Sequence, residues 1–174
     1  MLSSDEEKRM LEQHAGEIFL RCYQQRFGIP GTLLHSNLPR KPDLSCKIGE
    51  QPVDLEIAHL YGSEEEAMLL LGRELDQKTR YALKQLWSDD DPHLRLVHSL
   101  NRILAHKSTR RYEAKRVWLV IRNAHPAWRT PIIRQQLDQV SLPRFHPFGQ
   151  IWIIGDLQGS SGMLQLYPGN PQTG

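Results

Sequence analysis

The sequence predicts an α/β domain with a mixed central sheet, in which an N-terminal β-hairpin precedes the other strands and helices flank the sheet. Three observations predict this class. They are a helical period that ends before residue 28, two alternating segments at 43–48 and 51–58, and two short apolar runs separated by a helix signal. A mixed sheet covered by helices accommodates all three.

The first predicted element is a helix over residues 4–27. Ser4 and Glu7 have the spacing of a capping box, and Gly28 is a residue type that commonly follows the end of a helix. Between these ends, apolar or small residues recur at helical intervals: Leu11, Ala15, Ile18 and Cys22. Residues 28–42 are rich in Gly and Pro, so we expect a loop there.

The hairpin comes next, with residues 49–50 as its turn. A two-residue turn fixes the pairing, so Ile48 opposes Gln51 and, further out, Asp43 opposes Glu56. Alternation sends the apolar side chains to one face: Leu44, Cys46, Ile48, Val53, Leu55 and Ile57. The other face receives the polar ones: Asp43, Ser45, Lys47, Asp54 and Glu56.

Two helices are predicted after the hairpin. Ser63 with Glu66 opens the first of them. The second begins after Asp91, which is followed by a Pro at the first helical position, and it runs to about Arg111. Its apolar stripe consists of Leu96, Leu100 and Ile103.

Strands are predicted in the last third of the chain. The runs at 117–121 and 151–154 are almost entirely apolar, which is typical of strands buried on both faces. A helix signal at 130–131 lies between them, so we expect a parallel crossover. A last strand at 163–166 is expected to close one edge of the sheet.

The chain has 174 residues, which fits a single domain, and we place it at residues 1–167. Residues 168–174 have nothing apolar to bury and are expected to be a disordered tail. No apolar run approaches the roughly 18 residues that span a bilayer, and the first residues lack a signal-peptide core. Cys22 and Cys46 lack metal-type spacing and suit a reducing compartment. We therefore expect a cytoplasmic protein without membrane association.

Asp43 and Glu56 are the candidate metal site. Directly opposed side chains on a sheet have Cβ atoms about 4.5–5.5 Å apart, and like charges at that separation destabilise the sheet. A divalent cation between them would remove the repulsion, and Mg²⁺ (or Mn²⁺) prefers carboxylate oxygens. The alternative is that this face is solvated, so that water screens the repulsion.

A group of cations lies at the end of the third predicted helix and just after it, in a chain whose net charge is +2. Its members are Lys107, Arg110, Arg111, Lys115 and Arg116. Such a group either contacts nucleic-acid phosphates or forms a solvated helix end, and both interpretations stay open.

The residues Pro42-Asp43, followed by the hairpin and by the segment Asp54-Leu55-Glu56-Ile57-Ala58, resemble the core motif of the PD-(D/E)xK nuclease superfamily. The resemblance implies a restriction-endonuclease-like fold with a helical insertion at 62–111. It implies hydrolysis of phosphodiester bonds in DNA or RNA, with Mg²⁺ held by Asp43, Glu56 and the backbone carbonyl of Ile57. Glu17 would be the extra acid that many members carry on the first helix. Members are often dimers, so a homodimer is implied as well.

One position departs from that motif. When Glu56 is the acid, Ala58 stands where the motif has its lysine. One alternative is that Asp54 is the acid and Glu56 takes the lysine position. Another is that the lysine comes from elsewhere, and Lys107 is the candidate because it continues the apolar stripe of its helix. If neither holds, the resemblance implies a catalytically inactive nuclease-like binding or regulatory protein.

Overall fold

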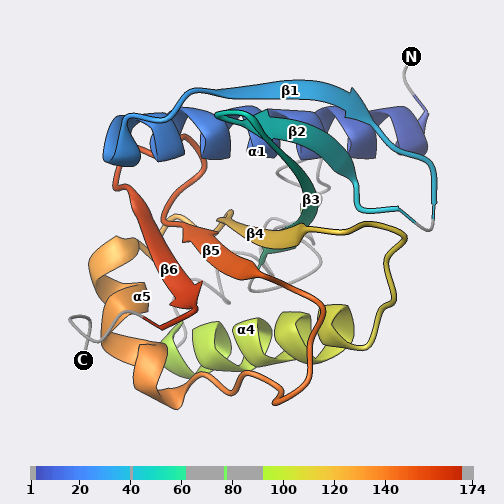
Figure 1. Cartoon of the computed structure of the whole chain (residues 1–174). Helices are drawn as coiled ribbons and strands as arrows, with labels where there is room; N and C mark the ends of the chain where they lie inside the picture. Colours follow the sequence, from blue (N-terminus) through green and yellow to red (C-terminus); the bar gives the residue numbers. More distant parts are fainter. Residues whose placement is uncertain (1–2, 40, 62–76, 78–91, 170–174) are drawn as a thin grey trace.

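The computed structural model describes residues 3–39, 41–61, 77 and 92–169, and these form three layers (Figure 1). A six-stranded mixed sheet lies between α1 on one face and α4 with α5 on the other. The mixed α/β class is thereby confirmed. The elements are α1 (Ser4–Phe27), β1 (Gly31–Ser36), β2 (Leu44–Ile48), β3 (Gln51–Leu60), α4 (Pro92–Ser108), β4 (Val117–Asn123), α5 (Thr130–Gln136), the short 3₁₀ helix Leu137–Gln139, β5 (Gln150–Ile154) and β6 (Met163–Tyr167).

Helix α1 has the predicted bounds, but its cap is shifted by one residue. The backbone N–H of Glu6 donates to Oγ of Ser3 at 3.2 Å, and the N–H of Ser3 donates to Oε2 of Glu6 at 2.8 Å. The capping box predicted at Ser4 and Glu7 is therefore wrong, because the capping residue lies just outside the helix. Gly28 closes the helix with a φ of 71°, a left-handed conformation that glycine adopts without strain.

Strand β1 lies within the segment for which the sequence predicts a loop. It pairs antiparallel with β2 and forms one edge of the sheet. Its side chains are half-buried or exposed, and polar residues flank the adjacent apolar pair Leu33 and Leu34. The loop prediction for residues 28–42 is wrong over these six residues, because the sequence of an exposed edge strand shows little alternation of apolar and polar residues.

The hairpin has the predicted register. Ile48 opposes Gln51, and Leu44 opposes Leu55. Strand β2 begins at Leu44, so β3 continues from Glu56 to Leu60 with β4 as its neighbour and without β2. We call residues 56–60 the open edge of β3, and it is here that the functional side chains gather.

Strands β3, β4 and β5 are parallel, and β6 pairs antiparallel with β5 at the second edge. This confirms the predicted crossover and the predicted edge strand. The central strands are buried on both faces, as their apolar runs indicate. Trp118 and Trp152 pack under α1, whereas Leu119 and Ile153 pack against α4 and α5.

Helix α4 confirms the third predicted helix, although it ends at Ser108 rather than near Arg111. The helix predicted from Ser63 and most of the predicted tail lie outside the described residues. Cys22 and Cys46 are free and buried. Within the part of the chain that the structure describes, no helix has the length and apolar character to cross a membrane.

Candidate functional site

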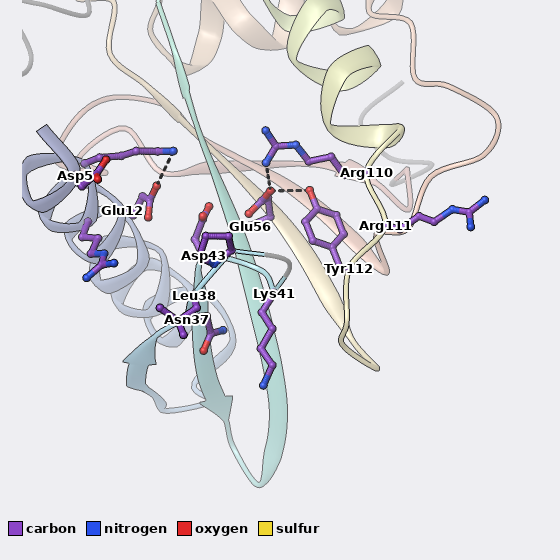
Figure 2. A pocket seen from close by; sticks show the side chains of 13 residues that line it. Asp5, Glu12, Asn37, Leu38, Lys41, Asp43, Glu56, Arg110, Arg111 and Tyr112 are labelled. Carbon is purple, nitrogen blue, oxygen red and sulfur yellow. Dashed lines mark hydrogen bonds and ion pairs between the residues drawn. The ribbon is translucent and has the colours of Figure 1, made fainter.

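A pocket with a volume of about 420 Å³ lies at the open edge of β3. Its walls come from the first turns of α1, from the loop that precedes β2, and from residues 110–112 after α4 (Figure 2). Asp43 and Glu56 lie at its centre. Strand β2 begins at Leu44, one residue after Asp43, so Asp43 belongs to the loop that borders the pocket.

The carboxyl groups of Asp43 and Glu56 face one another, as Figure 2 shows. Oδ2 of Asp43 accepts the backbone N–H of Ile57 at 2.8 Å, and a hydrogen bond joins the two acids. Burial, together with the hydrogen bond to Glu56 and its charge, raises the pKa of Asp43 to about 8. At neutral pH the pair therefore shares one proton. The two acids that the hairpin register predicts to be opposite one another thus lie side by side, although Asp43 precedes β2 and is not part of the β2–β3 ladder.

Glu56 is only 1% exposed, and three donors converge on one of its oxygens. Oε2 accepts from Nζ of Lys107 at 3.3 Å, from Nη1 of Arg110 at 3.2 Å and from the hydroxyl of Tyr112 at 2.6 Å. Burial would raise the pKa of Glu56, but the hydrogen bond with Asp43 and the charge of Lys107 outweigh it and lower that pKa. Glu56 is thus the ionised member of the pair.

Lys107 reaches the site because of where it stands on α4. Leu96, Leu100 and Leu104 form the buried face of the helix, each with no exposed surface. Lys107 follows Leu104 by three residues, so it lies on the same face one turn later, and its side chain is 14% exposed. This confirms the prediction that a lysine from this helix approaches the acid pair.

Two acids of α1 line the pocket, the exposed Asp5 and the buried Glu12, and the sequence patterns singled out neither. Glu12 lines the pocket from α1 and is 9% exposed, and burial raises its pKa, with the charge of Lys8 opposing that effect. Glu17 is exposed and does not line the pocket, so the structure does not bring it to the pair. Glu12 precedes the buried residues Ala15 and Phe19 by three and seven positions, and that spacing could have identified it.

Asp54 lies outside this pocket. It is two residues before Glu56 on the same strand face, but it lines a separate hollow together with Lys115 and Arg116. In that hollow Nη1 of Arg116 donates to the side chain of Gln51 at 3.1 Å. The geometry thus favours Glu56 over Asp54 as the partner of Asp43.

The predicted phosphate-binding cations divide between the two places. Arg110 and Arg111 line the pocket, whereas Lys115 and Arg116 line the other hollow. Arg110 bonds to Glu56 and also contacts the ring of His106 at 3.2 Å. Three further cations that the sequence reasoning missed border the pocket from α1 and from the preceding loop: Lys8, Arg9 and Lys41.

The described residues contain no group of three or more His, Cys, Asp or Glu side chains arranged to hold a metal ion. Comparisons of the chain with protein-family models, with curated proteins and with solved structures find no match. What the pocket can do therefore follows from its chemistry. Two facing acids, one of them protonated, lie in a pocket that lysine and arginine side chains also line. This arrangement suits an anionic substrate.

Proposed function

We propose that this protein is a metal-dependent nuclease with a restriction-endonuclease-like fold, which hydrolyses phosphodiester bonds of DNA or RNA. The observation that carries the proposal is the pairing of Asp43 with Glu56 beside Lys107, at an open strand edge bordered by cations. The acid pair and the lysine come from distant parts of the chain and yet touch one another. We therefore interpret them as a site for phosphoryl chemistry rather than as an ion pair with only a structural role.

The donor set fits Mg²⁺ or Mn²⁺. Burial and the neighbouring Glu56 raise the pKa of Asp43, and a divalent cation can take the place of the proton that Asp43 then holds. Glu12 supplies a third carboxyl group at the same pocket. When bound, the ion would supply Lewis acidity toward water and toward the phosphate.

The other residues of the pocket would position the substrate. Lys107 would hold a phosphoryl oxygen or the attacking water through its ammonium group, which already lies against Glu56. Arg110 and Arg111 on one wall, with Lys8 and Arg9 on the other, would contact backbone phosphates without reading base sequence.

A second candidate function is a nuclease-like binding protein without catalysis. It is favoured by the three donors on Oε2 of Glu56, which neutralise that carboxylate without a metal. It is also favoured by Ala58, which is buried at the position where the motif has its lysine. This protein would bind nucleic acid through the same cations.

Thermal melts with and without Mn²⁺, combined with a cleavage assay on single- and double-stranded DNA and RNA, test the proposal. We expect Mn²⁺ to raise the melting temperature and to support cleavage, because a ligand of the folded state stabilises it by mass action. Asp43→Asn should abolish both effects. Asp54→Asn is the matched control, since Asp54 is an acid of the same hairpin outside the pocket. If Mn²⁺ does not change the melting temperature of the wild type and no cleavage occurs, the nuclease proposal is wrong and the binding protein is favoured.

A further inference from the structure

A second polar cluster lies at the carboxyl ends of β3 and β4, on the face that α1 covers. His59 and Arg122 are partners in the parallel ladder, so their side chains are neighbours on one face of the sheet. Ile57 and Val120, each two residues earlier, belong to the core beneath α1, which identifies that face. In open α/β sheets this end of the parallel strands is where ligands bind.

Arg122 is a buried cation whose hydrogen bonding is incomplete. It is 2% exposed, and its Nε and Nη2 donate to the carbonyl of Leu157 at 3.0 and 2.7 Å. Nη2 also contacts Nδ1 of His14 at 3.3 Å, whereas Nη1 has no partner among the described residues. These contacts are all to neutral groups. A buried guanidinium without a counter-charge is costly, and burial lowers the pKa of Arg122 accordingly.

His59 adds a second unsatisfied nitrogen to the cluster. Its Nε2 is buried and has no partner in the described part of the chain. The ring stacks on Tyr61 with centroids 5.9 Å apart, so the imidazole is held in place. The imidazole carries at least one N–H, and Nε2 can present it to a ligand.

Among the described residues, this cluster has no anionic acceptor. The free Nη1 and the adjacent Nη2 of Arg122 form one side of a guanidinium, the geometry that binds two oxygens of a phosphate at once. His14 is exposed, so its imidazole can turn from Nη2 toward an oxygen that is bound there. No carboxylate of the described residues bonds to the cluster.

We propose that Arg122, His59 and His14 form a binding site for a phosphate group, distinct from the pocket of Asp43 and Glu56. The phosphate is either free inorganic phosphate or the 5′-phosphate of a nucleotide. The inference does not depend on the proposed nuclease activity. The site lies three residues beyond Glu56, about 10 Å along β3 at a rise of about 3.3 Å per residue.

Thermal melts at constant ionic strength test this site, with inorganic phosphate, a nucleoside 5′-monophosphate and the matching nucleoside as probes and chloride as the reference salt. We expect phosphate or the monophosphate to raise the melting temperature of the wild type, and the nucleoside to leave it unchanged. A response to the monophosphate alone identifies a nucleotide as the source, and a response to both identifies the phosphate group itself.

Three variants and two controls make the test specific. His14→Ala and His59→Phe should raise the half-saturating phosphate concentration about tenfold, the loss expected for one charge-assisted hydrogen bond, and Arg122→Gln should remove the response. His59→Phe keeps the stacking on Tyr61, so it carries the test if Arg122→Gln fails to fold. Arg102→Gln, which removes an exposed arginine elsewhere, and Asp43→Asn should both respond like the wild type. Equal shifts in all variants, or no shift with either phosphate compound, would overturn the proposal.

Discussion

Nζ of Lys107 lies 3.3 Å from Oε2 of Glu56, across a separation of 51 residues in the sequence. The lysine comes from the last turn of α4 and the glutamate from the open edge of β3. Both side chains are largely withdrawn from water, with 14% and 2% of their surface exposed. This contact joins the helical layer to the sheet at the centre of the candidate site, and three of the following predictions concern it.

Glu56→Gln should destabilise the metal-free protein by roughly 2–4 kcal/mol, because it leaves the buried ammonium of Lys107 without a charge partner. Denaturant unfolding measures this loss. Glu50→Gln is the control, since Glu50 also pairs with a lysine, Lys47 at 3.1 Å, but is 91% exposed. That variant should change the free energy of unfolding by less than about 1 kcal/mol.

The double variant Glu56→Gln/Lys107→Met separates charge from packing. It leaves no unpaired ammonium, so it should be more stable than Glu56→Gln alone. If the double variant is instead less stable than Glu56→Gln alone, the stability of this region comes from side-chain packing rather than from the ion pair.

Lys107→Met should lower the rate of cleavage at least about a hundredfold, the usual loss when one donor to a developing charge is removed. The response of the melting temperature to Mn²⁺ should persist, because the acids remain. Lys115→Met is the matched control from the same cationic group, and it lies outside the pocket. Unchanged cleavage by Lys107→Met would remove this lysine from the mechanism.

Glu12→Gln should weaken the stabilisation by Mn²⁺, so that about tenfold more metal is needed for the same rise in melting temperature. The reason is the position of Glu12, which lines the pocket from α1 and is almost completely buried. Glu17→Gln, five residues further along the same helix, should respond to Mn²⁺ as the wild type does. Equal effects of the two variants would mean that the helix charge acts at long range rather than as a ligand.

Asp156→Asn should destabilise the protein by about 1–3 kcal/mol at neutral pH. The carboxylate of Asp156 accepts the backbone N–H groups of Gln158, Ser160 and Ser161, and it thereby holds the loop between β5 and β6. Although burial acts against it, these hydrogen bonds, first among them that of Ser161, lower the pKa of Asp156 below its ordinary value of 3.8.

The sign of the pH dependence follows from that lowered pKa. The stabilisation by Asp156 is fully present above about pH 4 and is lost as the pH falls through the pKa of the folded state. The difference in unfolding free energy between wild type and Asp156→Asn should therefore be constant from pH 5 to 7 and should shrink below pH 4. A difference that stays constant down to pH 2 would show that the loop is held by neutral hydrogen bonds.

The sequence predicts those parts of the site that depend on local periodicity. The opposition of Asp43 and Glu56 follows from a two-residue turn and from alternation along two strands, and both are local properties. The approach of Lys107 follows from its spacing after Leu100 and Ile103, because a helical face is set by counting residues.

The missed parts depend on tertiary placement. Glu12 was missed although it shares the buried face of α1 with Ala15 and Phe19, because that face becomes a wall of the pocket only where α1 packs beside the acid pair. Arg110 and Tyr112 lie after the end of α4, in a segment without periodicity, so their convergence on Glu56 was not predictable. Strand β1 was missed because its edge position leaves its side chains half-buried or exposed, so that its sequence does not alternate between apolar and polar residues.

The placement of Lys107 on α4 also determines which mutations in this helix preserve the site. Each residue of an α-helix advances the side-chain direction by about 100°. One codon inserted or deleted between Leu104 and Lys107 would therefore turn the ammonium about a quarter of the way around the helix, while Leu96, Leu100 and Leu104 stayed packed. Such a frame-preserving indel would yield a folded protein with an incomplete site, whereas a substitution at an exposed position of the same helix, such as Arg102, would leave the site whole.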